Sequence, residues 1–308
     1  MLRRARIALA TLAMASVAGC GLGPGKGTSD VTLTVTHGFG TGPVASLTAH
    51  QVPGSETVMR VLQRSLKVQT RYGGGFVQSI DGLSGGSAHN DWFYYVNGVQ
   101  AAAGAATTAV HRGDRIWWDL HDWSATESIP AVVGSFPEPF VHGVGGKRLP
   151  VTVECSSDVG PACDKVSAAL AAIGVPGARQ YIGTGSGPDS LGVVVGTWRE
   201  LDGQVASALI SKGPSASGVY AKFTSAAGDS LQLLDPQGRV VRTLGAGAGL
   251  IAATGDPQSE PTWLITGTDT AGVLAAAQAL TAVRLRNHFA LAVQGATGIP
   301  VPVQGAGG

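Results

Sequence analysis

One stretch of 33 residues, Asp91–Trp123, constrains the fold of this 308-residue chain more than any other. It reads DWFYYVNGVQAAAGAATTAVHRGDRIWWDLHDW and holds 7 of the 18 aromatic residues and 4 of the 6 Trp. Trp and Tyr bury a large ring while they keep a polar tip, so a dense group of them is typical of a core or of a binding face. The rest of the chain must therefore cover these rings or leave them open to a partner.

The N-terminus predicts export. A charged start is followed by an apolar run, Ile7–Val17, which is too short to span a bilayer as a permanent helix. The next residues, Val17-Ala18-Gly19-Cys20, resemble the lipobox of bacterial lipoproteins, which implies cleavage before Cys20 and lipidation of its thiol. We therefore expect a signal peptide (1–19), a lipidated Cys with a flexible tether (20–30), and a protein held by this lipid on the extracytoplasmic face of the cell membrane. An ordinary secretory signal with a chance Cys remains the alternative.

The two other cysteines, Cys155 and Cys163, form an even pair in a chain predicted to be exported. Such a pair favours a disulfide. A metal-binding pair is the alternative, but no second pair of ligands lies nearby in the sequence, and no His pair has the close spacing of a metal site. The spacing therefore predicts a structural disulfide and no bound metal.

The charge balance argues against nucleic acid as a partner. The chain has 21 Lys and Arg against 20 Asp and Glu, and no basic run follows the signal peptide. Binding to a phosphate backbone requires a concentrated basic surface. We expect the membrane, reached through the lipid, and either a small molecule or an envelope protein as partners.

Residues 31–124 predict an α+β arrangement in which one helix covers a sheet. Strand-period alternation in 30–36 and 44–52 is followed by a helix from Glu56 to Leu66 with Ser55 as its N-cap. Asn97-Gly98 is a strong tight-turn signal because both residues tolerate positive φ. Further short strands are predicted at 68–71, 76–80, 92–96 and 115–120.

Four motifs in this part carry a family resemblance. They are Thr-Val-x-x-Val-Leu from Thr57, Ile-Asp-Gly from Ile80, Trp-x-Tyr-Tyr-Val-Asn-Gly from Trp92, and Gly-Asp-x-Ile-x-Trp from Gly113. Together they resemble the transcobalamin C-terminal-like β-grasp domain of bacterial surface proteins. The resemblance implies a β-grasp fold, one helix on a mixed sheet, over residues 31–124. It also implies a binding role with cobalamin or a related corrinoid as the first candidate ligand, because a similar domain closes over the corrinoid in animal cobalamin carriers.

The remainder predicts a Pro/Gly-rich linker, 125–149, and an α/β domain, 150–308. Two segments of this domain, VVVGTWRELDGQVASALI and WLITGTDTAGVLAAAQAL, share one plan: an apolar strand, Gly-Thr, a polar turn and a helix. The plan indicates strand–turn–helix repeats and an old duplication. Helices are expected at 162–173, 200–210 and 270–285, strands at 151–154, 191–197, 250–253, 262–266 and 289–293, and an antiparallel meander across 219–244.

The strand period divides the last aromatic segment into two faces. Ile116, Trp118 and Leu120 should form the core under the helix, whereas Trp117, Asp119, His121 and Trp123 should lie on the open face of the sheet. One hypothesis makes this open face a ligand site; the other has the second domain pack on it. On the first hypothesis the rings stack on the ligand, Asn97 and Asp119 form hydrogen bonds, and His121 reaches a corrinoid metal. The candidate ligand-binding residues are Trp92, Tyr95, Asn97, Trp117, Asp119, His121 and Trp123.

No sequence pattern assigns a catalytic nucleophile, a metalloprotease site or a carboxylate pair. We therefore expect a binding protein that is not an enzyme and requires no cofactor. The function we predict is a lipid-anchored extracytoplasmic ligand-binding protein, with cobalamin or a corrinoid as ligand, that feeds a transporter. The alternative is a non-catalytic structural or interaction lipoprotein of the cell envelope.

Overall fold

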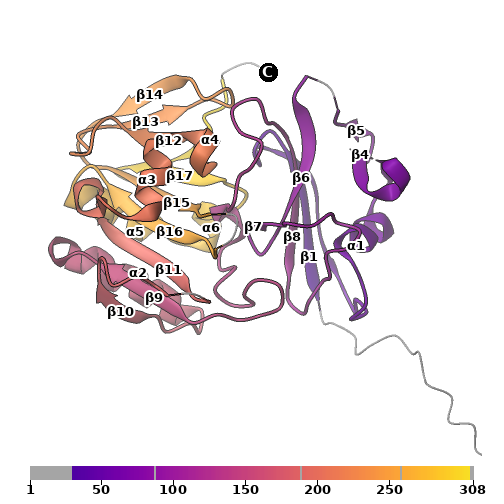
Figure 1. The fold of residues 1–308 in the computed structure, drawn as a ribbon, viewed down its shortest axis with the longest axis horizontal. Coiled ribbons are helices and arrows are strands. Elements are labelled where there is room, and N and C mark those ends of the chain that lie inside the picture. Colours follow the sequence, from indigo (N-terminus) through magenta and orange to yellow (C-terminus); the bar gives the residue numbers. More distant parts are fainter. Residues whose placement is uncertain (1–29, 87, 188, 257–258, 306–308) are drawn as a thin grey trace, which may run out of the picture.

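The computed structural model describes residues 30–305 except 87, 188, 257 and 258. The predicted signal peptide, Cys20 and most of the tether lie outside this part. The fold is α+β, as the sequence predicts, with an N-terminal half and a C-terminal half that lie side by side (Figure 1). Within the described residues, no helix combines the length and apolar character that a membrane crossing requires.

The N-terminal half is built on a mixed sheet of five strands in the order β2-β1-β8-β6-β7. The central strands β1 and β8 run parallel, and each remaining neighbouring pair is antiparallel. A single helix lies on one face, as expected for a β-grasp arrangement. The elements are β1 (Val31–His37), β2 (Gly42–Ala49), α1 (Val58–Ser65), β6 (Asn90–Val96), β7 (Val99–Gln100) and β8 (Arg115–Asp122).

The core under α1 confirms the predicted inner face. Ile116, Trp118 and Leu120 are buried with the apolar side of the helix. Trp92 belongs to the same core, because it stands opposite Leu120 in the β6–β8 register. Beyond α1 a small antiparallel sheet joins β3 (Val68–Arg71), β4 (Phe76–Ile80) and β5 (Leu83–Ser84).

The start of α1 differs from the prediction. Thr57, not Ser55, is the N-cap, and its hydroxyl accepts the Arg60 backbone N–H at 3.4 Å. Glu56 is buried in the extended chain before the helix, where its carboxylate pairs with Arg64 and its backbone carbonyl accepts the Val110 N–H. This anchoring delays the helix by two residues.

The C-terminal half contains a seven-stranded sheet in the order β10-β9-β11-β16-β15-β17-β18. Neighbouring strands from β10 to β16 are parallel, and β15 and β18 are antiparallel to their neighbours. The two edge strands β10 and β18 were not predicted. The strands are β9 (Val151–Cys155), β10 (Ala178–Tyr181), β11 (Leu191–Thr197), β15 (Ala248–Thr254), β16 (Thr262–Gly267), β17 (Ala290–Gln294) and β18 (Thr297–Val301).

The two faces of this sheet carry different layers. One face packs against α2 (Gly160–Ala172), α5 (Thr270–Ala279) and α6 (Ala282–Leu285). The other face packs against α3 (Val205–Ser211) and a meander of three strands. The meander consists of β12 (Ala221–Phe223), β13 (Leu231–Leu234) and β14 (Val240–Leu244), and α4 (Pro214–Ser217) precedes it.

The two segments with a shared plan are not repeated in space. The helix after β16, α5, covers one face of the sheet, whereas α3 after β11 covers the opposite face. The predicted helix 200–210 is also broken into the short turn Trp198–Leu201 and α3. The predicted helix 270–285 ends at Ala279, and α6 restarts with Thr281 as N-cap. Both segments keep the strand–turn–helix order, but their helices lie on opposite faces of the sheet and begin with different caps.

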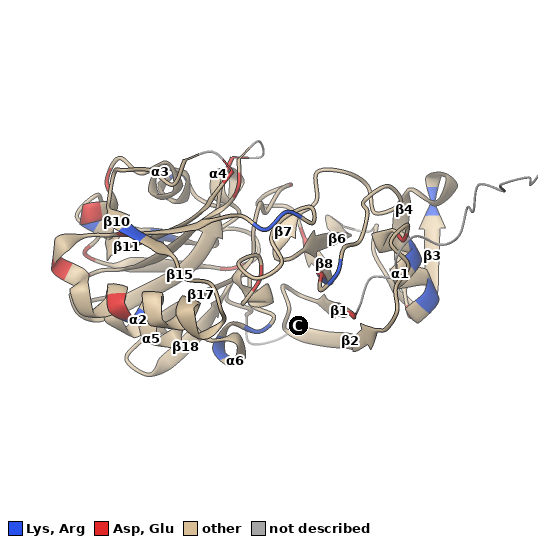
Figure 2. Cartoon of the chain, turned by 90° about the horizontal axis from the view of Figure 1, so that it is seen from below, with Lys and Arg blue, Asp and Glu red and all other residues tan. Residues whose placement is uncertain are grey.

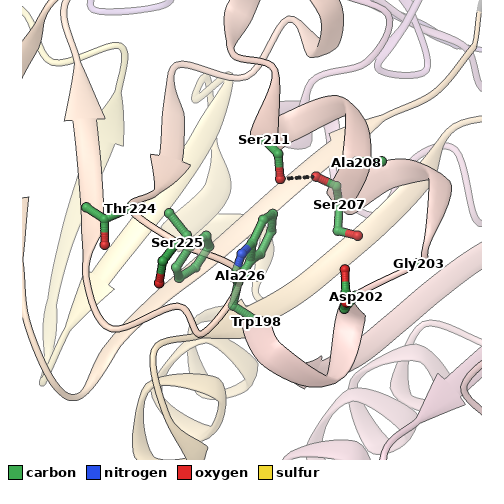
Figure 3. Close-up of a pocket in the computed structure, with 10 residues that line it drawn as sticks. Trp198, Asp202, Gly203, Ser207, Ala208, Ser211, Thr224, Ser225 and Ala226 are labelled. Atoms are coloured by element: carbon green, nitrogen blue, oxygen red, sulfur yellow. Dashed lines mark hydrogen bonds between the residues drawn. The ribbon is translucent and has the colours of Figure 1, made fainter.

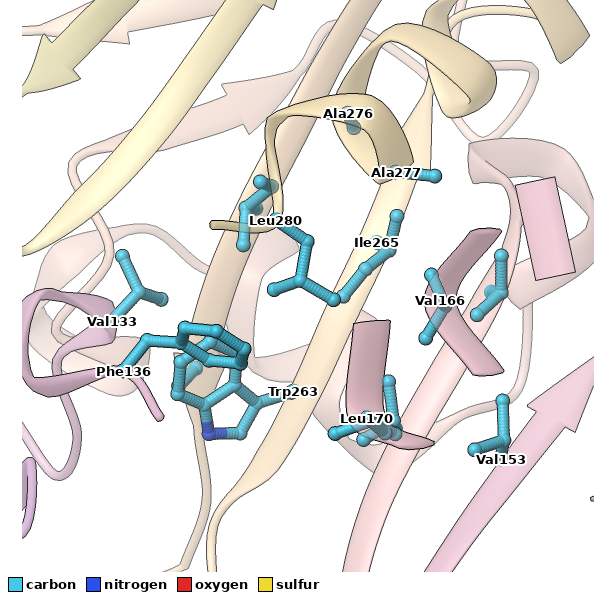
Figure 4. Packing of buried hydrophobic residues seen from close by; sticks show 14 of the residues in the cluster. Val133, Phe136, Val153, Val166, Leu170, Trp263, Ile265, Ala276, Ala277 and Leu280 are labelled. Carbon is cyan, nitrogen blue, oxygen red and sulfur yellow. The ribbon is translucent and has the colours of Figure 1, made fainter. Parts of the chain in front are cut away.

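Residues 125–149, predicted as a linker, form a packed crossing segment. As expected they contain little regular structure, only one short 3-10 turn at Val133–Ser135. However, Val133, Phe136 and Phe140 are buried in the core of the C-terminal half. The ring of Phe136 lies 6.0 Å from the ring of Trp263 on β16 (Figure 4). The ring of Phe140 lies 5.0 Å from the same Trp263 ring. The crossing segment therefore ties the two halves together instead of separating them.

Cys155 and Cys163 are joined by a disulfide, which confirms that prediction. Their Cα atoms are 6.0 Å apart, and the bond connects the end of β9 to the first turn of α2. Both residues are buried in the core of the C-terminal half.

Replacing both cysteines, Cys155→Ala with Cys163→Ala, should lower the free energy of unfolding by about 2–3 kcal/mol. This is the loop-closure entropy of a bridge between residues eight positions apart. Denaturant titration of the variant and of the unmodified protein with and without a reductant checks it. The reductant should lower the stability of the unmodified protein and leave that of the variant unchanged. Free thiols at Cys155 and Cys163 in the unmodified protein, unfolded without reductant, would contradict the disulfide.

Candidate functional site

The outer face of the N-terminal sheet is closed by the rest of the chain. Trp117, Asp119 and His121 point away from α1, but they are only 3%, 0% and 2% exposed. Phe93 and Tyr95 of β6 stand opposite Asp119 and Trp117 and complete this face. The expectation of an open face is therefore wrong, and the alternative arrangement, in which the second half packs there, is what the fold adopts.

Phe289, which precedes β17, is the centre of this contact. Its ring centroid lies 5.2 Å from that of Trp117, 5.3 Å from His121 and 5.7 Å from Tyr95. Each of these ring pairs is edge-to-face, a geometry that aromatic quadrupoles favour. We call the whole group the aromatic seam: Phe39, Phe93, Tyr95, Trp117, His121, Tyr220 and Phe289.

Asp119 organises the polar part of the seam. One carboxylate oxygen accepts the Phe39 N–H at 3.0 Å and faces the His121 Nδ1 at 2.9 Å. The other accepts the Gly40 N–H at 2.8 Å and the Thr36 hydroxyl, which itself accepts the Trp117 indole N–H at 2.7 Å. A buried carboxylate is tolerated only when it is fully hydrogen-bonded, and these donors provide that. The network is therefore structural and holds the β1–β2 turn against β8.

His121 is enclosed by rings and is not placed to ligate a metal. It stacks on Phe93 at a centroid distance of 4.4 Å, and Phe39 lies 4.6 Å away on another side. Its Nδ1 faces Asp119. In this position the imidazole acts as a packed member of the seam rather than as the corrinoid ligand we expected.

The other predicted site residues are dispersed. Trp92 lies on the opposite side of the sheet in the α1 core. Asn97, fully buried, donates to Asp114 at 2.9 Å and to the Gly143 carbonyl at 2.8 Å. Trp123 is partly exposed at the strand end, where its indole N–H donates to Asp91 at 2.9 Å. The seven residues thus serve the core, a turn and the seam, and they do not converge on one cavity.

The phenol groups of the seam are held neutral. Burial raises the pKa of Tyr95 well above its ordinary value, and the neighbouring Asp119 carboxylate raises it further. Burial likewise raises the pKa of Tyr220. Neither hydroxyl has a hydrogen-bond partner among the described residues. Both tyrosines therefore stabilise the fold through the packing of their rings, and ionisation of either phenol would destabilise the folded protein.

Phe289→Ala should lower the free energy of unfolding by about 3–5 kcal/mol, because it removes a fully packed ring from a core contact. Since this ring joins the two halves, calorimetry should also show the single transition split into two. Val283→Ala, which truncates an 80% exposed side chain nearby in sequence, is the control and should leave the transition unchanged. A single cooperative transition with unchanged midpoint in Phe289→Ala would contradict the proposed coupling.

The raised pKa of Tyr95 predicts a loss of stability at alkaline pH. The Tyr95 phenol ionises near pH 10 in the unfolded chain, whereas the folded chain keeps it protonated. The free energy of unfolding is therefore unaffected by this group below about pH 10 and falls as pH rises above it. Tyr95→Phe should reduce this loss by up to about 1.4 kcal/mol per pH unit. Denaturant titrations at several pH values measure it; an identical pH dependence in both proteins would count against it.

Where the halves meet beside the seam, three adjoining hollows form a groove, here called the junction groove. The largest, about 440 Å³, is bounded by the loop Ala101–Ala103, by Val144 of the crossing segment and by Glu260. The second, about 410 Å³, shares Glu260 with the first and reaches Ser190, which precedes β11. The third, about 250 Å³, shares Gln100 with the first and reaches Ser128, Pro130 and Gly255.

The lining of the junction groove combines small apolar side chains with a few polar ones. The alanines of the loop after β7 line the largest hollow, and Gln100, His111 and Glu260 supply polar atoms. Burial raises the pKa of Glu260, the Asp189 carboxylate raises it further, and Lys147 opposes both. An apolar hollow with a few convergent polar groups is the usual form of a small-molecule site.

Sequence reasoning missed this groove. The small-residue run 101–106, five alanines and Gly104 just after β7, was the available signal, because side chains this small leave space that larger ones would fill. Its opposite wall includes Glu260, about 160 residues further along the chain, and no local pattern links the two.

A further hollow, about 270 Å³, lies beside the carboxyl end of β11 (Figure 3). Trp198 forms part of it and stacks on Phe223 at 4.2 Å. The hydroxyls of Ser207 and Ser211 bond to backbone carbonyls of α3 and its preceding turn. Since these polar atoms already serve the helix, this hollow is a weaker candidate than the junction groove.

Comparison with known proteins gives one family match. Residues 55–122 match the family described as a domain of unknown function (DUF4430). No curated protein matches the chain. A crystal structure of a candidate metal binding protein from Ruminococcus gnavus is similar over 30% of this chain and 97% of its own, with 21% identity and a TM-score of 0.25. The described residues of the present chain contain no group of three or more His, Cys, Asp or Glu placed to hold a metal ion.

Proposed function

We propose that this chain is a lipid-anchored extracytoplasmic binding protein, not an enzyme, whose ligand site is the junction groove. The observation that carries the proposal is the convergence of three segments on one apolar hollow: the loop after β7, the crossing segment and the chain before β16. The matched domain at 55–122 supplies the first of these segments, and its resemblance to the transcobalamin-like β-grasp domain supports a binding role.

Cobalamin or a related corrinoid is the first candidate ligand, which the protein would pass to a transporter. The largest hollow, about 440 Å³, has the size of a small-molecule site, so a corrinoid would lie along the groove with one edge enclosed. Ala101–Ala103 would face its apolar surface, and Gln100 and Glu260 would bond to its amides. His111, partly exposed at the rim with its Nδ1 3.6 Å from Asp114, is the imidazole available to a metal in place of the buried His121.

Filling the groove should weaken ligand binding. Ala102→Trp places a large ring in the largest hollow and should weaken ligand affinity by at least about tenfold, or 1.4 kcal/mol. Ala106→Trp adds the same ring to the same loop at an exposed position outside the lining and is the matched control. Calorimetry and Trp fluorescence with cyanocobalamin and cobinamide measure the effect.

Two results would count against the proposal in different ways. No heat and no fluorescence change at micromolar corrinoid would remove corrinoids as ligands. Equal weakening by Ala102→Trp and Ala106→Trp would remove the groove as the site.

The second candidate is a non-catalytic envelope protein that binds another protein. The closed aromatic seam favours it, because the face expected to hold a planar ligand instead joins the two halves. Retention of a specific envelope protein by the unmodified chain, unaffected by Ala102→Trp, would support this candidate over the first.

A further inference from the structure

Two aromatic rings are exposed together at the tip of the β3–β4 hairpin. Tyr72 is 87% exposed and Phe76 is 38% exposed, and their rings meet edge-to-face at 6.4 Å across three glycines. In the described part of the chain, no other two strongly exposed aromatic side chains are in contact. The hairpin lies at the end of the molecule furthest from the C-terminal half (Figure 2).

The backbone holds Tyr72 outward at a cost. Its φ is +53°, in the left-handed region that bulky side chains rarely adopt. Gly73 and Gly74 follow with φ of +69° and +94°. Backbone outliers of this kind tend to persist where they serve a contact. The conformation presents the ring to the surroundings instead of folding it back on the sheet.

The surface around the hairpin is basic. Arg60 and Arg64 lie one turn apart on α1, and Lys67 and Arg71 lie just before β3 and at its end; all four are exposed. Figure 2 shows this basic colouring on α1 and β3. Residues 55–85 contain two acidic residues, of which Glu56 is buried against Arg64. The other, Asp81, accepts the Lys67 backbone N–H at 2.8 Å.

We infer that this basic–aromatic end, formed by Arg60, Arg64, Lys67, Arg71, Tyr72 and Phe76, contacts the anionic headgroups of the membrane that holds the protein. Aromatic rings with a polar tip settle at the membrane–water interface, and Lys and Arg are attracted to anionic lipid within a Debye length. The chain as a whole is nearly neutral, with 21 basic and 20 acidic residues, so the positive charge is a local property of this end.

The inference rests on the proposed lipid anchor at Cys20. Ten residues, from Gly21 to Asp30, separate Cys20 from β1 and span at most about 35 Å when extended, so the anchor keeps the N-terminal half near the bilayer. Contact through the hairpin orients the molecule with its C-terminal half directed away from the membrane.

Vesicle sedimentation tests this contact without the lipid anchor. The full mature chain with Cys20→Ser, which cannot be acylated, should bind vesicles of equal parts phosphatidylglycerol and phosphatidylcholine. Binding should fall as ionic strength rises and should be absent with phosphatidylcholine alone. Tyr72→Ser with Phe76→Ser, and separately Arg60→Gln with Lys67→Gln and Arg71→Gln, should each weaken binding by about tenfold or more. Arg64 is left unchanged because it pairs with Glu56.

The matched control is on β14 of the other half. Val240→Ser, Val241→Ser and Arg242→Gln together remove two exposed apolar side chains and one exposed basic side chain, and should leave binding unchanged. The inference is overturned if both hairpin variants bind like the parent chain, if vesicle binding is absent, or if binding is independent of phosphatidylglycerol. Fatty-acid labelling of the unmodified chain in cells tests the anchor at Cys20 separately, so the two failures are distinguishable.

Discussion

The packing of Phe289 into the outer face of the N-terminal sheet is the interaction on which the rest of this structure depends. It brings one ring of the C-terminal half against Trp117, His121 and Tyr95, which would otherwise be exposed. Because water is excluded there, Asp119 must find all its partners inside the protein, and it finds them in the β1–β2 turn and His121. Ring packing and the buried carboxylate network therefore form together, and each requires the other.

Because the aromatic seam is closed, the candidate ligand site lies beside the seam and not within it. The strand that carries Trp117 has no free face, and the junction groove lies where the loop after β7 meets the crossing segment and the chain before β16. The same closure joins the two halves into one unit. Its N-terminal end is basic and aromatic around Tyr72, and the junction groove lies between the halves.

Sequence reasoning succeeded where the determining interactions are local. The alternation of Ile116, Trp118 and Leu120 identified the inner face because the strand period is a property of neighbouring residues. Asn97-Gly98 forms the predicted turn, with φ of +53° and +77°. Sequence reasoning failed at Ser55, because the burial of Glu56 displaced the start of the helix. It also failed in the crossing segment, because proline and glycine exclude regular structure but do not indicate whether a segment is buried.

The sequence by itself determined the α+β class, most strands and helices, the inner core of the N-terminal sheet and the Cys155–Cys163 bond, since each depends on periodicity, turn chemistry or residue pairing close along the chain. Only the tertiary structure decided what covers the outer face and where a cavity remains. Phe289 is about 170 residues from Trp117, and Glu260 is about 160 from Ala101. Contacts at such separations depend on how whole helices and strands pack together. The residue pattern of a strand can therefore show that one face is apolar and must be covered, but it does not identify the segment that covers it.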